Sequence, residues 1–86
     1  MVSETMTVKC PIGLHMRPAG VFANEMLKYD SDVTIVFKEK RVNAKSLLSI
    51  MAASIKYGSE ITVECSGADE TAALHRAEEL IAAVLL

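Results

Sequence analysis

The two prolines of this 86-residue chain, Pro11 and Pro18, constrain where its first strand ends and where its first helix begins. Met6, Val8 and Cys10 alternate with polar residues, which predicts a strand with one buried face. This strand should end at Pro11, because proline cannot donate a hydrogen bond to a sheet ladder. Proline is tolerated in the first turn of a helix, where the N–H groups have no intrahelical partner. The helix should therefore begin only a residue or two before Pro18.

The rest of the chain switches repeatedly between the apolar spacing of a helix and that of a strand. The first helix should end at the polar run 30–32 and bury Ala19, Phe22, Ala23, Met26 and Leu27. The elements expected after it are a strand through Val33, Ile35 and Phe37, a short strand over 41–43, a helix from Ser46 to about Ser54, a strand through Ile61, Val63 and Cys65, and a last helix capped by Asp69. This order predicts an α+β fold, an open-faced two-layer sandwich with a four-stranded, mainly antiparallel sheet and three helices on one face.

Length and charge limit the class of protein. A chain of this length is expected to form one domain, residues 1–86, and to bury roughly 60% of its unfolded surface. The net charge of −2 and the lack of a basic run argue against nucleic acid as a direct partner. No apolar run approaches the roughly 20 residues that cross a bilayer, and no secretory leader is apparent. We therefore expect a cytoplasmic monomer without membrane insertion.

The cysteines and histidines do not predict a metal site. Cys10 and Cys65 lack C-x-x-C spacing and have no pair of histidines nearby in sequence. Both are expected to be free, buried thiols. His75 should face solvent on the last helix. We expect neither a metal nor a cofactor.

His15 is the candidate for chemistry, because it falls at or beside the N-cap of the first helix. The free N–H groups there and roughly half a unit of positive charge from the helix dipole form an anion site. Arg17 adds a permanent cation whose planar fork suits a phosphate. Positive potential favours a neutral imidazole, which can act as a nucleophile, and would stabilise an anionic phosphohistidine. These charges favour phosphoryl transfer over metal binding, but a histidine beside a proline is also often an ordinary loop residue.

Two segments carry a resemblance to a known family. Residues 13–19, Gly-Leu-His-Met-Arg-Pro-Ala, are similar to the active-site signature of the histidine-containing phosphocarrier protein HPr of the bacterial phosphoenolpyruvate:sugar phosphotransferase system. Residues 42–51, Val-Asn-Ala-Lys-Ser-Leu-Leu-Ser-Ile-Met, resemble the signature around that family's regulatory serine. Residues 58–63 and 66–70 are also similar, so the resemblance covers nearly the whole chain. It implies a single HPr-like domain with an open-faced sandwich fold.

The resemblance implies a phosphoryl carrier rather than an enzyme in the strict sense. His15 would accept a phosphoryl group at Nδ1 from phosphorylated enzyme I and pass it to a sugar-specific enzyme IIA. Arg17 would stabilise the phosphoryl group, and Pro18 would set the helix start. Two residues depart from the family pattern, since Ile12 replaces the usual small polar residue and Met16 the usual alanine. We expect these departures to affect transfer rate or partner choice without removing the basic activity.

Ser46 has both a structural and a functional interpretation. Serine is a good N-cap for the expected second helix, and this role alone would explain it. The resemblance adds a regulatory phosphorylation site. It implies an HPr kinase/phosphorylase and a catabolite-control transcription factor as further partners.

The second predicted helix carries more apolar residues than one face can bury. Such residues mark a contact site if they are exposed, whereas a tightly packed core would bury them. The resemblance favours a surface that receives the phosphoryl donor and acceptors. The residues assigned to this partner surface are Leu47, Leu48 and Met51, with Met16, Gly20 and Val21 of the first helix.

Two other functions stay open. One is a regulatory adaptor that acts only through phosphorylation of Ser46 and binding of a transcription factor. His15 counts against it, because such relatives typically lack the active histidine. The other is a small α+β binding module with an incidental histidine, and the two matching segments argue against it.

Overall fold

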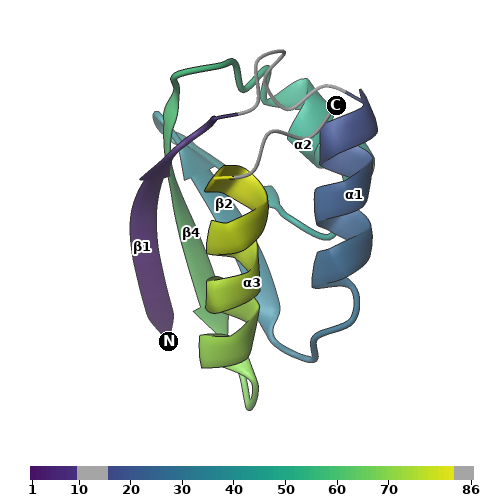
Figure 1. Ribbon diagram of the computed structural model, residues 1–86, viewed down its shortest axis with the longest axis vertical. Helices are drawn as coiled ribbons and strands as arrows, with labels where there is room; N and C mark the ends of the chain where they lie inside the picture. Colours follow the sequence, from purple (N-terminus) through teal and green to yellow (C-terminus); the bar gives the residue numbers. More distant parts are fainter. Residues whose placement is uncertain (10–15, 83–86) are drawn as a thin grey trace.

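The computed structural model describes residues 1–9 and 16–82, which form a sheet with helices on one of its faces (Figure 1). The elements are, in chain order, β1 (Val2–Thr7), α1 (Met16–Met26), β2 (Asp32–Phe37), β3 (Lys40–Asn43), α2 (Leu47–Ala52), β4 (Glu60–Ser66) and α3 (Glu70–Ala82). This is the predicted order of strands and helices. The predicted α+β sandwich with an open sheet is confirmed.

The sheet has the strand order β1-β4-β2-β3, and each pair of neighbours is antiparallel. Cys65 of β4 lies opposite Val2 of β1 on one side and opposite Val33 of β2 on the other. Along β4, Ile61, Val63 and Cys65 are buried, whereas the residues between them are more exposed. This alternation is the predicted one, and it gives the sheet one face toward the helices and one face away from them.

The core lies between the sheet and the helices. α1 and α3 lie side by side over the sheet, α3 in contact with β1 and β4, and α2 beside α1 (Figure 1). Phe22 and Met26 of α1, Ile35 of β2 and Ile50 of α2 are among the largest fully buried side chains. Burial of each such side chain contributes about 1.5–3 kcal/mol relative to exposure. The apolar faces of helices and sheet therefore determine how α1 and α2 are placed.

The first strand differs from its predicted position. β1 is Val2–Thr7, whereas the alternation of Met6, Val8 and Cys10 predicted a strand that ends at Pro11. The partner strand sets the actual limits, because Thr7 lies opposite Glu60, the first residue of β4. Val8 is buried beyond the end of the strand. Cys10 and Pro11 lie outside the described residues.

Two helices end earlier than predicted. α1 ends at Met26 rather than at 30–32, and Leu27, which we expected in the core, is 59% exposed. Leu27 lies at the edge of the apolar stripe and follows the last helical residue, so the neighbouring elements do not cover it. α2 ends at Ala52 rather than near Ser54. Ser54 has a left-handed φ of 54°, which cannot continue a right-handed helix.

Asp69 joins two loops that are far apart in sequence. It stands directly before α3, as predicted for the cap, and its carbonyl accepts a hydrogen bond from Ala73 N at 3.0 Å. Its carboxylate instead accepts hydrogen bonds from Asp30 N and Ser31 N, both at 2.9 Å, and from Ser31 Oγ. Ser31 is fully buried, and a Cβ atom on Gly67 would lie 2.7 Å from Ser31 Cα. Asp69 and Gly67 thus hold the connection between α1 and β2 against the start of α3.

Protonation of Asp69 should destabilise the protein. The hydrogen bond from Ser31 Oγ and those from the N–H groups of Asp30 and Ser31 lower the pKa of Asp69 below its ordinary value. The contribution of the ionised Asp69 carboxylate to the free energy of unfolding is complete above the pKa of an unfolded aspartate, about 3.9. It is lost as the pH falls through the lower pKa that Asp69 has in the folded protein. We expect Asp69→Asn to reduce the free energy of unfolding near neutral pH, and its difference from the wild type to shrink below about pH 4.

Urea unfolding at a series of pH values measures this difference. Asp32→Asn is the matched control, because Asp32 is exposed and its carboxylate accepts no hydrogen bond from the described residues. The control should follow the wild type throughout. A deficit in Asp69→Asn that stays the same across the acid range would contradict the assigned role of Asp69.

Candidate functional site

The first turn of α1 carries the positive end of a helix. α1 begins at Met16, so Pro18 occupies its first turn, as predicted. Pro18 is buried and Arg17 is exposed. The first turn contains no acidic residue that would offset the helix dipole. The start of α1 therefore presents N–H groups that have no intrahelical partner, with the Arg17 guanidinium and without a carboxylate in the same turn.

His15 and Ile12 lie outside the described residues, as does the side chain of Met16. His15 directly precedes Met16, the first helical residue, in the sequence. The predicted position of the helix start relative to the histidine is thereby confirmed.

Ser46 is the N-cap of α2, as predicted. Its backbone is extended, with φ −110° and ψ 113°, and its Oγ accepts a hydrogen bond from Ser49 N at 3.3 Å. Two contacts fix the chain before it. Lys45 N donates to Asn43 Oδ1 at 3.0 Å, and Lys45 Nζ donates to the carbonyl of Tyr29 at 2.7 Å. The half-buried Ser46 side chain is thus held at the start of α2 by the cap and by the connection to β3.

The partner surface predicted on α1 and α2 is exposed only in part. Leu48 is 79% exposed and Val21 39% exposed, although both are apolar. Leu47 and Met51 are half-buried and pack against the core, and Gly20 is half-buried in α1. The other apolar residues of this segment, Ile50 and Ile55, are buried.

Leu27 is an exposed apolar residue that the helical spacing did not identify, since spacing placed it in the core. Its position just after the end of α1 is the reason for its exposure. The exposure of Leu27 could have been predicted only if the sequence had indicated that α1 ends at Met26.

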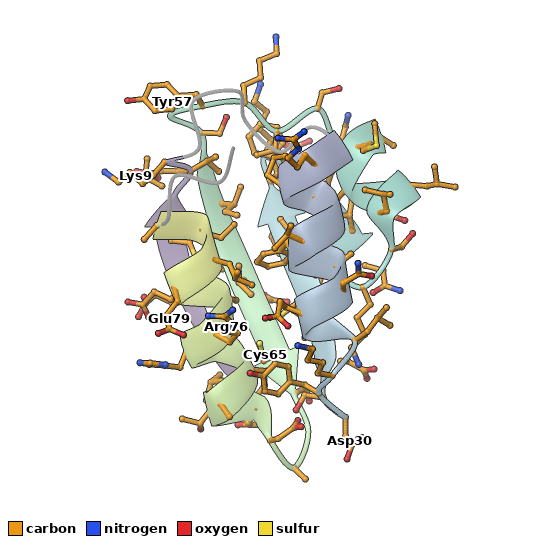
Figure 2. The ribbon with its side chains drawn as sticks, turned by 45° about the vertical axis from the view of Figure 1, so that its right-hand side comes forward. Lys9, Asp30, Tyr57, Cys65, Arg76 and Glu79 are labelled. Atoms are coloured by element: carbon orange, nitrogen blue, oxygen red, sulfur yellow. The ribbon has the colours of Figure 1, made fainter. Side chains whose placement is uncertain are left out.

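An ion-pair network joins α1 to α3 away from the start of α1. Arg76 Nη2 lies 2.7 Å from Glu25 Oε1, and Arg76 Nη1 lies 3.4 Å from Glu79 Oε1. Figure 2 shows Arg76 and Glu79 close together on α3. The ammonium of Lys28 and the Arg76 guanidinium lower the pKa of Glu25. The charges of Glu25, Lys28 and Arg76 thus offset one another, and the Arg76–Glu25 ion pair links α3 to α1.

Few other groups could react. Cys65 is buried as predicted, and burial raises the pKa of its thiol. His75 is exposed, as predicted, and its Nδ1 lies 3.9 Å from a Glu79 carboxylate oxygen. Within residues 1–9 and 16–82, no group of three or more His, Cys, Asp or Glu side chains could hold a metal ion. Over the same part of the chain, no helix is both long and apolar enough to cross a membrane.

Comparison with known proteins decides the family. The family model described as the PTS HPr component phosphorylation site matches residues 2–83. The chain belongs to the HPr family. The phosphocarrier protein HPr of Mycoplasma capricolum subsp. capricolum is 46% identical over 63 residues, which are 73% of this chain and 71% of that protein.

Two further HPr-family members extend the match. The HPr-like protein Crh of Bacillus subtilis is 37% identical over 76 residues, 88% of this chain and 89% of that one. The crystal structure of HPr-C-His from Thermoanaerobacter tengcongensis matches with a TM-score of 0.91 at 33% identity, covering 94% of this chain and 91% of that one. The resemblance seen in the sequence and the fold it implied are confirmed.

Loss of the Ser46 hydroxyl should destabilise the protein. We expect Ser46→Ala to lower the free energy of unfolding by about 1 kcal/mol, because Ser49 N loses its capping partner. Thermal or urea unfolding measures the loss. Ser49→Ala is the control, because it changes a serine inside α2, where alanine is a better helix former, and leaves the capped N–H in place. Equal losses in the two variants would contradict a specific capping role.

Proposed function

We propose that the protein is a phosphocarrier of the bacterial phosphoenolpyruvate:sugar phosphotransferase system. His15 accepts a phosphoryl group from phosphorylated enzyme I and passes it to a sugar-specific enzyme IIA. Membership of the HPr family, over residues 2–83, is the observation that carries this proposal. The start of α1 directly after His15 in the sequence supports it.

The chemistry follows from the charges at the start of α1. The neutral Nδ1 of His15 attacks phosphorus, and the bond from phosphorus to the enzyme I donor breaks as the new P–N bond forms. The phosphoryl oxygens gain negative charge near the first-turn N–H groups and Arg17, which stabilise it. In the onward transfer, a bond from phosphorus to enzyme IIA forms as the P–N bond to His15 breaks. The chain acts as a stoichiometric relay, so it needs no metal or cofactor of its own, and we place it in the cytoplasm as a monomer.

The partner surface brings donor and acceptors to His15. It comprises Leu47, Leu48 and Met51 of α2 with Met16, Gly20 and Val21 of α1. The exposure of Leu48 and Val21 supports this assignment, because exposed apolar side chains on a small protein mark contact sites. The contact between α1 and α2 supports the assignment of both sets to one surface (Figure 1).

Ser46 is the proposed regulatory site. A kinase of the HPr kinase/phosphorylase type would phosphorylate it, and the phosphorylated form would bind a catabolite-control transcription factor. A phosphate at the N-cap meets the favourable end of the α2 dipole, so the fold should tolerate it. The phosphate beside Leu47 and Leu48 would have to lose its hydration when an apolar partner docks. Phosphorylation should therefore weaken partner binding rather than the fold.

A second function, that of a regulatory adaptor, is favoured by one observation. Two relatives are named HPr-like protein Crh, at 37% identity in Bacillus subtilis and 40% identity in Halalkalibacterium halodurans. A protein acting only through Ser46 would not need His15. Phosphorylation of His15 by enzyme I therefore distinguishes the two functions.

His15→Ala should abolish phosphoryl acceptance and leave the fold intact. The test incubates the protein with phosphoenolpyruvate and a matching enzyme I, and measures one acid-labile phosphoryl group per chain. His75→Ala is the matched control and should be labelled normally, because His75 is exposed on α3.

Arg17→Ala should slow labelling by about tenfold or more, since the nucleophile stays while charge stabilisation is lost. Absence of labelling in the wild type would remove the carrier function.

Ser46→Asp should slow phosphorylation of His15 by enzyme I and leave the melting temperature close to that of the wild type. Aspartate keeps the cap but adds charge to the partner surface, although it carries less charge than phosphate. Ser46→Asn is the control, because it caps the helix without a charge. A transfer rate equal to that of Ser46→Asn, or a much lower melting temperature, would contradict this account of regulation.

A further inference from the structure

A basic hollow lies at the end of the sheet where β2 ends and β4 begins. It has a volume of about 550 Å³ and is lined by Lys38 and Lys40 of the β2–β3 hairpin and by Ser54, Lys56 and Ser59 of the segment after α2. That segment crosses one end of the molecule, at the top of Figure 1. Figure 2 shows Tyr57 of the same segment pointing outward, and its ring is not among the lining groups. This volume falls in the range of about 300–1,000 Å³ that is typical of small-molecule sites.

The charge of the hollow is opposite to that of the whole chain. Three lysines and one carboxylate, Glu60, line it, which gives a local charge of 3 − 1 = +2, whereas the chain has a net charge of −2. None of the three lysines forms an ion pair with a carboxylate of the described residues. By contrast, Arg76 of α3 and Lys28 after α1 each pair with the Glu25 carboxylate. The hollow therefore concentrates positive charge that the described residues do not neutralise.

Two lining residues have an unusual backbone. Lys38 has φ 57° and Ser54 has φ 54°, and they are the two non-glycine residues of the described chain with positive φ. A hairpin turn and a helix end each account for such a φ locally, but glycine would adopt it at lower cost. At both positions the chain has a polar residue that lines the hollow, a lysine and a serine, instead of glycine. Backbone outliers of this kind cluster at binding sites.

The apolar part of the lining adds a third feature. Phe37 and Ala53 also line the hollow, and Lys38 Nζ lies 5.3 Å from the centre of the Phe37 ring. Ser59 Oγ accepts a hydrogen bond from Lys56 N at 3.2 Å, which leaves its O–H free to donate. Three lysines, two serines and two apolar residues therefore line one hollow.

We propose that this hollow binds a small phosphate ester of a polyhydroxylated molecule. The lysine ammoniums hold the phosphate, the hydroxyls of Ser54 and Ser59 bond to hydroxyl groups of the ester, and Phe37 contacts its carbon skeleton. The concave shape and small volume favour a low-molecular-weight ligand over a macromolecule. None of the described lining residues is one that we propose for the phosphoryl relay, so this inference does not rest on the relay.

The test is an NMR titration of the whole protein with glucose 6-phosphate at low salt, with glucose and inorganic phosphate as parallel probes. We expect saturable amide shifts at Lys38, Ser54 and Ser59, with binding at least about tenfold tighter than that of either parallel probe. Added salt should weaken the binding. Equal affinity for inorganic phosphate and the ester would overturn the proposal, as would shifts that do not saturate or that map elsewhere.

Matched variants separate the hollow from general surface charge. Lys40→Gln with Lys56→Gln should weaken binding of glucose 6-phosphate by at least about tenfold. Lys28→Gln removes a lysine that follows α1 and does not line the hollow, and this variant should bind as the wild type does. His15→Ala should also bind normally, so failure of the relay and failure of this site are distinguishable. Retained binding in the double variant would refute the assignment.

Discussion

The central pairing of β4 with β2 and β1 is the constraint on which the rest of the structure depends. β4 comes late in the chain but lies between strands from the first half, so the sheet exists only when both ends of the sequence meet. Its buried residues Ile61, Val63 and Cys65 form the centre of the surface on which α1 and α3 pack. The positions of the two helix starts that we propose as functional depend on this surface.

α1 and α2 each have apolar residues that pack in or against the core on one side and an exposed apolar residue on the other. The inward face of α1 supplies Phe22 and Met26 to the core, and α2 supplies Ile50. Leu48 and Val21 are exposed, so the proposed partner surface draws on side chains outside the core. The start of α1 and the cap of α2 use the same property, since each leaves first-turn N–H groups that attract negative charge. In α2, the Ser46 hydroxyl accepts a hydrogen bond from the N–H group of Ser49. Ser46 is therefore a structural residue as well as a candidate regulatory one.

The order of elements and the helix starts were predictable because they depend on local chemistry. Pro18 restricts where α1 can begin, and Ser46 supplies a hydroxyl for a helix N-terminus, so both starts agree with the structure. Element ends were less predictable. The limits of β1 depend on pairing with Glu60 of a distant strand, and the exposure of Leu27 depends on where α1 stops and which elements cover it. Local apolar spacing contains neither piece of information.

The sequence by itself determined the alternation of strands and helices, the family, and the residues His15, Arg17 and Ser46 as candidates, because backbone preferences and short motifs are local properties. Only the tertiary structure decided which groups from distant segments meet. Asp69 resembled an ordinary cap, yet its carboxylate holds Asp30 and Ser31 across the fold. Lys38 and Lys40 belong to the β2–β3 hairpin and Lys56 to the segment after α2, and the fold brings the three around one hollow. The physical reason is that long-range pairing and burial, which fix these contacts, depend on the whole chain at once.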